Sequence, residues 1–185
     1  MTPEDLLVST CAPMLRTLSA WLDKARAQEG VDAKALLAAR LAPDMFPLAT
    51  QVRFACVQAQ EGMHRLKGED FPAPLVDLLN EARNAGDRPG TLADAQARIA
   101  QTLALLDAFA PAGGDPQRPI AHALPIGMTF DLTADQYVRD WVLAQFYFHV
   151  MIAYAILRAQ GVALGKGDYV AHMLPFLRPT ATQES

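Results

Sequence analysis

Cysteines, strand-forming residues and lysines are all scarce in this sequence of 185 residues. The two cysteines, Cys11 and Cys56, lie far apart among apolar neighbours and form no Cys-x-x-Cys pair. This spacing argues against a disulfide framework and predicts reduced, buried thiols in a cytosolic protein. Val and Ile number 10 and 5, against 33 Ala and 24 Leu. Because Ala and Leu favour helices, a sheet-dominated fold is not expected.

The sequence has no excess of positive charge. Lys and Arg number 16 against 20 Asp and Glu, a net charge of −4, and no basic cluster occurs, which argues against a nucleic-acid partner. The first residues include Glu4 and Asp5, where a signal peptide carries basic residues, so we expect a cytoplasmic protein. Apolar residues make up 51% of the chain. We therefore expect one domain over residues 1–178, followed by a disordered tail at 179–185.

One long apolar run could be mistaken for a membrane span. From Trp141 to Leu157 there are 17 residues without a formal charge. A membrane-spanning helix needs about 20 predominantly apolar residues. Here Gln145, Tyr147, His149 and Tyr154 interrupt the run. We therefore expect a core helix buried by its neighbours, and no membrane partner.

Helix caps and apolar stripes predict four long helices. They are expected at Pro3–Gln28, from a cap at Asp44 to Gly68, from Thr91 to about Phe109, and from Thr133 to Gln160. Shorter helices are expected at 33–41 and within 69–90. Residues 120–124 and 128–132 are predicted to pair as a small hairpin or to form an extended crossover. The predicted fold class is all-α, a four-helix bundle with a long crossover before the last helix.

His149 is the most informative candidate, because it stands in the middle of the most apolar helix. A buried imidazole needs a hydrogen-bond partner. On the second long helix, Gln51, Phe54 and Gln58 share one side at helical spacing. If that side faces His149, a small polar pocket forms inside the bundle. The histidine then has three interpretations: a core residue satisfied by glutamine or a backbone carbonyl, a ligand-contacting or catalytic residue, or a metal ligand.

Further polar residues lie near these helices. Tyr147, Met151, Tyr154 and Arg158 share a second side of the last helix, and Arg40 and Asp44 have the spacing of an ion pair. We expect mainly structural roles for both sets. The candidate pocket residues are His149, Gln51, Gln58, Tyr154, Gln145, Arg158 and Asp44. No His-Glu-x-x-His, His-x-x-x-His, phosphate-loop or Gly-x-Ser-x-Gly motif occurs.

Two sequence blocks resemble a known family. The first is Arg40-Leu41-Ala42-Pro43-Asp44-Met45-Phe46-Pro47-Leu48, followed by Gln51-Val52. The second is Phe146-Tyr147-Phe148-His149-Val150, then Ala153-Tyr154-Ala155-Ile156-Leu157-Arg158, Gly161-Val162, Gly165-Lys166 and Asp168-Tyr169. Together they resemble a domain-of-unknown-function family of the DinB/YfiT-like superfamily, which includes metal-binding members. The order and spacing of elements agree over most of residues 1–172, although the segment 70–90 is longer than expected.

The resemblance implies a DinB-type four-helix bundle, often dimeric, with a pocket at one end. Metal-binding members use one histidine on the second helix and a pair four residues apart on the fourth, and the metal supports hydrolysis or thiol transfer. Only His149 matches this set, since Gln145 and Ala153 stand four residues to either side. On the second helix, Cys56-Val57-Gln58 offers no histidine. Zinc needs about three protein ligands, so the usual metal set is incomplete.

These observations favour a metal-free protein that binds a small molecule or acts as a homodimeric interaction module. The alternative is a divalent-metal (zinc or nickel) hydrolase or thiol transferase with a different ligand set, in which His149 acts with Asp44 or His172. A purely structural partner protein would instead show a large apolar surface patch and no defined pocket.

Overall fold

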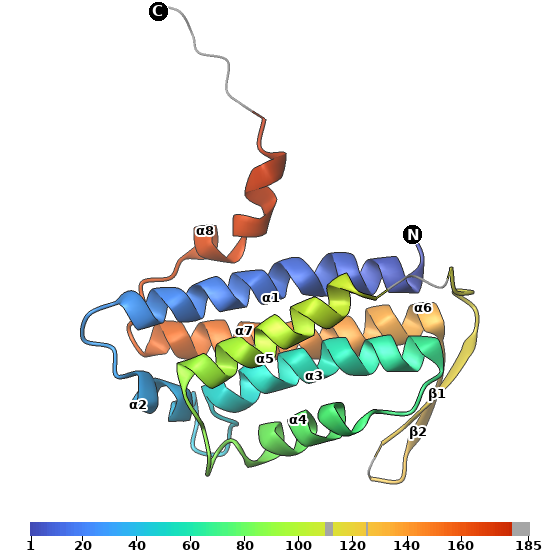
Figure 1. Cartoon of the computed structure of the whole chain (residues 1–185), viewed down its shortest axis with the longest axis horizontal. Coiled ribbons are helices and arrows are strands. Elements are labelled where there is room, and N and C mark those ends of the chain that lie inside the picture. Colours follow the sequence, from blue (N-terminus) through green and yellow to red (C-terminus); the bar gives the residue numbers. More distant parts are fainter. Residues whose placement is uncertain (110–112, 125, 179–185) are drawn as a thin grey trace, which may run out of the picture.

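The computed structural model describes residues 1–109, 113–124 and 126–178. Four long helices, which pack side by side, make up most of it (Figure 1). They are α1 (Pro3–Ala27), α3 (Leu48–Lys67), α5 (Leu92–Asp107) and α7 (Leu143–Ala159). The shorter elements are α2 (Ala33–Ala38), α4 (Ala73–Asn84), β1 (Pro119–Ala123), β2 (Thr129–Thr133), α6 (Ala134–Gln136), the π-helix η1 (Tyr137–Val142), α8 (Lys166–Tyr169) and the 3-10 helix η2 (Ala171–Phe176). The mostly helical fold is as predicted, and the tail predicted to be disordered lies outside the described residues.

Several helix ends lie where local chemistry predicts them. Thr2, Thr91 and Thr133 each cap a helix, and each forms a reciprocal capping box with the residue three positions on. Gly68 ends α3 in the left-handed conformation, with φ of 70°. These signals are local, because the cap and the backbone amide that it satisfies are neighbours in the sequence.

The predicted cap at Asp44 is wrong. α3 begins at Leu48, with Pro47 in the extended cap position. The Leu48 N–H donates to the Ala39 carbonyl at 2.9 Å, so a backbone group from the end of α2 satisfies it. Asp44 is exposed, and Arg40 donates to the Pro43 carbonyl at 3.4 Å instead of pairing with Asp44. The α2 helix also ends at Ala38, earlier than predicted.

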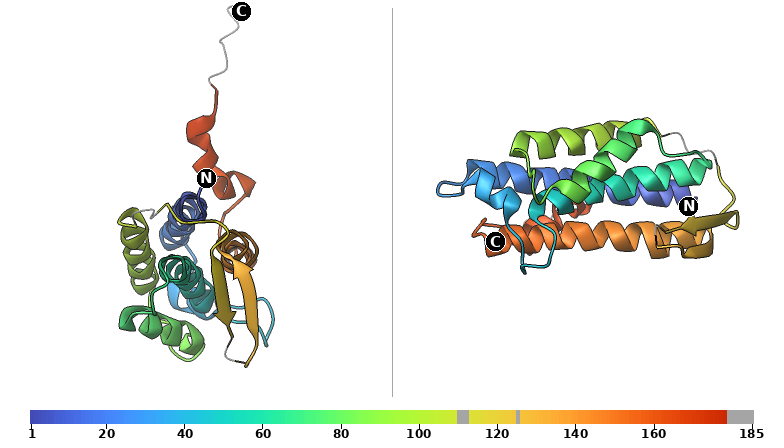
Figure 2. Two further views of the ribbon diagram at one scale, coloured as in Figure 1. Left: turned by 90° about the vertical axis from the view of Figure 1, so that its right-hand side faces the viewer. Right: turned by 90° about the horizontal axis from the view of Figure 1, so that it is seen from below.

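α3 is the central helix, in contact with α1, α4, α5 and α7 (Figure 2). Gly62 lets α1 and η1 approach it closely. A Cβ atom at Gly62 would lie 3.0 Å from Leu7 Cδ1 and 3.2 Å from Val142 Cγ1, closer than ordinary van der Waals contact. Both predicted thiols, Cys11 and Cys56, are buried and free.

The predicted last helix, Thr133–Gln160, is not a uniform α-helix. Between α6 and α7 the chain forms a π-helical segment, in which the Leu143 N–H donates to the Val138 carbonyl five residues back. In the part of the chain that the structure describes, Ala134–Ala159 is the one helical stretch long and apolar enough to cross a membrane by length and composition. It packs against α1 and α3.

The predicted pairing before the last helix is present as a two-stranded antiparallel sheet. Ile120 pairs with Leu132 and His122 with Phe130. Exposure alternates along β1, so that Ile120 and His122 are buried. The sheet lies at the α6 end of the last helix, far from α2 (Figure 1).

Candidate functional site

His149 and Gln51 meet where α7 packs on α3. The His149 Nδ1 atom lies 2.8 Å from the Gln51 Oε1 atom. The Gln51 Nε2 atom donates to the Phe46 carbonyl at 3.1 Å, which orients the amide so that its oxygen faces the ring. Nδ1 must therefore carry the proton and donate to Oε1, and Nε2 keeps an unprotonated lone pair.

The surroundings of His149 are apolar. The imidazole stacks on Phe54, with 5.0 Å between centroids and 17° between planes, and meets Phe148 edge-on at 5.4 Å. The side chain is 8% exposed. Burial lowers the pKa of His149 to about 4. The ring is therefore neutral at neutral pH, and it offers a fixed hydrogen-bond acceptor rather than a group that exchanges protons there.

Two further glutamines lie on the helix faces that carry Gln51 and His149. Gln58 follows Gln51 by two helical turns, and its Oε1 atom is buried without a hydrogen-bond partner among the described residues. Gln145 is half-buried one turn before His149. We call the polar strip formed by Gln51, Gln58, Gln145 and His149 the glutamine seam.

The other candidate residues make different contacts. The Tyr154 ring packs edge-on against Trp21 at 5.2 Å and against Tyr169 at 6.4 Å. Arg158 donates to the Leu164 carbonyl. Both side chains thus hold the segment after α7 against the bundle. Asp44 lies exposed in the connection between α2 and α3.

The donor set does not fit a metal ion. Across residues 1–109, 113–124 and 126–178, no group of three or more His, Cys, Asp or Glu side chains is placed to hold one. The side chain that faces His149 from α3 is an amide. Glu61 and His64 have the Glu-x-x-His spacing of di-iron helices. The His64 ring is already engaged, however, because its Nδ1 atom lies 3.0 Å from Glu69 Oε2. Burial raises the pKa of Cys56 to about 12, which keeps that thiol protonated.

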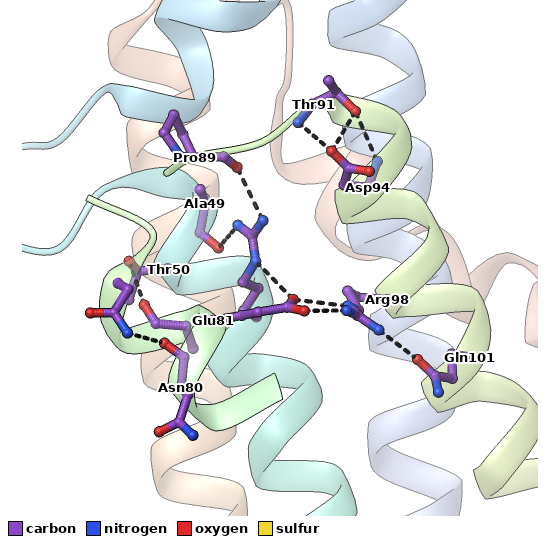
Figure 3. Close-up of polar contacts among 12 residues, drawn as sticks. Ala49, Thr50, Asn80, Glu81, Pro89, Thr91, Asp94, Arg98 and Gln101 are labelled. Atoms are coloured by element: carbon purple, nitrogen blue, oxygen red, sulfur yellow. Dashed lines mark hydrogen bonds and ion pairs between the residues drawn. The ribbon is translucent and has the colours of Figure 1, made fainter. Parts of the chain in front are cut away.

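A charged network on the opposite side of α3 was not predicted (Figure 3). Arg53, only 5% exposed, donates to the Ala49 and Pro89 carbonyls, each at 3.1 Å. Its Nε atom lies 3.8 Å from a Glu81 oxygen, which is an ion pair too long for a hydrogen bond. The Glu81 carboxylate also accepts from the Nε and Nη2 atoms of Arg98.

This network borders a cleft of about 540 Å³, which we call the arginine cleft. Its lining residues are Arg53, Pro74, Asp77, Asn80, Glu81, Asn84, Arg88 and Arg98. Arg53, Glu81 and Arg98 come from α3, α4 and α5, so their contacts tie these helices together. No local sequence signal identifies the network, because each partner lies on a different helix.

Comparisons with known proteins agree on family and fold. The family described as a domain of unknown function, DUF1993, matches residues 4–170. The crystal structure of a DinB family member protein from Shewanella denitrificans is similar, with 36% sequence identity and a TM-score of 0.76 over 95% of each chain. None of the curated proteins matches this chain.

Proposed function

Because the chain belongs to the DUF1993 family and resembles a DinB family member in structure, we propose that it is a metal-free protein that binds a small molecule in the glutamine seam. In this proposal residues 1–178 form one DinB-type four-helix bundle, with the two strands as a hairpin in its long crossover. The protein acts in the cytoplasm.

The observation that carries the proposal is the fixed tautomer of the neutral His149 ring. The Gln51 carbonyl oxygen holds the Nδ1–H, so Nε2 can only accept a hydrogen bond at neutral pH. A ligand with a hydroxyl, amide N–H or ammonium donor complements such an atom. Gln58 and Gln145 supply amide groups on the same faces, whereas Tyr154 and Arg158 would act by holding the segment after α7 against the bundle, and Asp44 lies exposed outside the seam.

The same feature favours binding over acid–base catalysis. A general base works best when its pKa is near the working pH. The pKa of His149, at about 4, lies well below neutral pH. The imidazole would therefore hold a proton only weakly in any reaction near pH 7, while its acceptor role is unaffected.

A fragment screen by ligand-observed NMR tests the proposal. We expect hits that carry hydroxyl or N–H donors to bind the wild type and to lose binding in His149→Phe, which keeps a ring but removes both nitrogens. His64→Phe is the matched control, because His64 pairs with Glu69 far along α3. Hits that bind His149→Phe as tightly as wild type would place the ligand elsewhere.

The alternative of a zinc- or nickel-dependent hydrolase or thiol transferase is tested by metal content. Protein purified without added metal or chelator is analysed by plasma mass spectrometry. We expect far less than one equivalent of any transition metal, even after dialysis against zinc or nickel. One equivalent that is lost in His149→Ala would overturn the metal-free proposal.

We further propose that the protein forms a homodimer. The helix η2 projects away from the four long helices (Figure 1). Large apolar side chains are exposed on η2 and on the residue that follows it. They are Met173, Leu174, Phe176 and Leu177. A second copy would cover this surface. Light scattering should then report a dimer for the wild type and a monomer for Phe176→Glu, and a wild-type monomer would refute the proposal.

A further inference from the structure

A second group of polar side chains lies toward the sheet end of the α3–α7 packing. Glu61 follows Gln51 by ten residues, about 15 Å along α3 at 1.5 Å per residue. Near it are Arg65, one turn further on, and Tyr137 of η1. His122 of β1 packs on Trp141, with 4.4 Å between centroids, and on Tyr137 at 5.3 Å. One cluster is thus supplied by α3 and by two elements, β1 and η1, that come much later in the sequence.

The polar atoms of this cluster lack partners. Nine buried side-chain nitrogen and oxygen atoms have no hydrogen bond within the described structure, and five of them are here. They are Arg65 Nε, both ring nitrogens of His122, Tyr137 Oη and Trp141 Nε1. His122 and Tyr137 are only 6% and 0% exposed. Buried polar groups in folded proteins are nearly always hydrogen-bonded, so their concentration at one place indicates a missing partner.

The backbone at this place is also unusual. Tyr137 and Trp141 both belong to the π-helical segment. Such segments are rare, and they occur frequently at functional sites. A π turn is less favourable than an α turn, and this segment also presents two polar side chains without partners to the same cluster. An interaction with a bound molecule would offset both costs.

The unpaired atoms define the chemistry of that partner. Arg65 Nε and Trp141 Nε1 can only donate hydrogen bonds, and Tyr137 and His122 can each donate one. The partner therefore needs acceptor oxygens. Arg65 supplies a positive charge, and burial raises the pKa of the nearby Glu61 carboxyl to about 7, which reduces its repulsion of an anion at neutral pH. A carboxylate meets these requirements.

The surface beside the cluster is open. A pocket of about 180 Å³ lies between the end of α3 and β1. Its lining residues are Arg65, Gly68, Glu69, Asp70, Arg118 and Pro119–Ala121, so Arg65 belongs to both the pocket and the cluster, and His122 directly follows the lining residue Ala121 in β1. Its volume suits a small molecule rather than a peptide.

We propose that Arg65, His122, Tyr137 and Trp141, with Glu61 beside them, form a second site that binds a small carboxylate. This site is independent of the glutamine seam, because it uses none of the seam's residues. A failure of either site therefore leaves the other untouched.

The two tryptophans allow a direct test. Trp21 Nε1 donates to the Asp168 carbonyl at 3.2 Å, whereas Trp141 Nε1 has no partner among the residues that the structure describes. Sodium acetate and sodium butyrate are titrated at constant ionic strength while the two indole N–H signals are followed by proton–nitrogen NMR. The signals are assigned with Trp141→Phe. We expect the Trp141 signal to move and saturate, while the Trp21 signal stays in place.

Variants then decide whether the cluster is responsible. Tyr137→Phe and Arg65→Met should each weaken the response at least tenfold, because each removes a donor and keeps most of the packing. Tyr147→Phe on α7 is the matched control and should respond as wild type. No movement of the Trp141 signal, an equal response in Tyr137→Phe, or a response to inorganic phosphate but not to the carboxylates would each overturn the proposal.

Discussion

Gln51 and Arg53 are two residues apart on α3, yet they point to opposite sides of the helix and into different environments. Gln51 faces α7 and makes one neutral contact with His149 inside an apolar surround. Arg53 faces α4 and α5, where two carbonyls and a carboxylate hold its charge beside the arginine cleft. Among the described residues, the arginine cleft holds one buried atom without a hydrogen bond, Arg53 Nε, whereas five such atoms gather at the sheet end of the α3–α7 packing. The arginine cleft and the main concentration of unmet hydrogen-bonding capacity thus lie in different places.

The largest expected effect on stability is at Arg53, in the charged network. Arg53→Met should lower the free energy of unfolding by about 3–4 kcal/mol, because it removes a buried cation and its hydrogen bonds to two carbonyls. Urea denaturation measures this loss. Arg88→Ala, on the exposed rim of the same cleft, should change stability by less than about 0.5 kcal/mol. Equal effects of the two substitutions would show that the network does not clamp the helices.

The next effect concerns pH and His149. Burial lowers the pKa of His149 from 6.5 to about 4, so the unfolded chain binds this proton more readily than the folded one. The stability linked to the neutral ring is present above pH 6.5 and is lost as the pH falls to 4, by about 3 kcal/mol in all. Wild type should lose this much more stability than His149→Phe between pH 7 and pH 4. Parallel pH profiles would contradict the buried, neutral histidine.

A double-mutant cycle isolates the contact itself. Gln51→Leu should cost about 2 kcal/mol, because the Nδ1–H of His149 is left buried without an acceptor. Gln51→Leu combined with His149→Phe should cost less than the sum of the single changes. Chemical denaturation of the four proteins measures the coupling. Additive costs would mean that the glutamine does not hold the ring.

The smallest expected effect concerns Glu61, whose contribution to stability falls as the pH rises, opposite to that of His149. Burial raises the pKa of Glu61 to about 7, so the folded protein binds this proton more readily than the unfolded chain does. The associated stability is present below pH 4.5 and is lost as the pH rises through 7, by about 1 kcal/mol after allowing for partial exposure. Glu61→Gln should remove this decline. An unchanged profile would show that the carboxyl ionises freely.

Local sequence signals predicted much of the fold. Thr91 and Thr133 lie three residues before Asp94 and Gln136, and both capping boxes form as expected. The contact between Gln51 and His149 is one of the alternatives that helical spacing and the need of a buried imidazole for a partner left open. In such cases the interacting groups either are neighbours in the sequence or have few alternatives.

Other features depend on groups that only the folded chain brings together. Asp44 has a suitable side chain for a cap, but the Ala39 carbonyl already satisfies the Leu48 N–H. His122 carries no motif, and its aromatic surround comes from η1 rather than from nearby residues. The π-helical segment itself keeps the hydrophobic pattern of an α-helix, so periodicity does not distinguish it.

The π-helical segment also takes up one extra residue within the last helix. In an α-helix each residue advances about 100° around the axis. The wider π turn, in which the Leu143 N–H donates to the Val138 carbonyl five residues back, adds a residue without turning α6 relative to α7 by that angle. Deleting one residue within Tyr137–Val142 would therefore restore an α-helical ladder and leave the two ends of the last helix in register. A deletion within α7, which has no such extra residue, would turn one part of the helix by about 100° relative to the other.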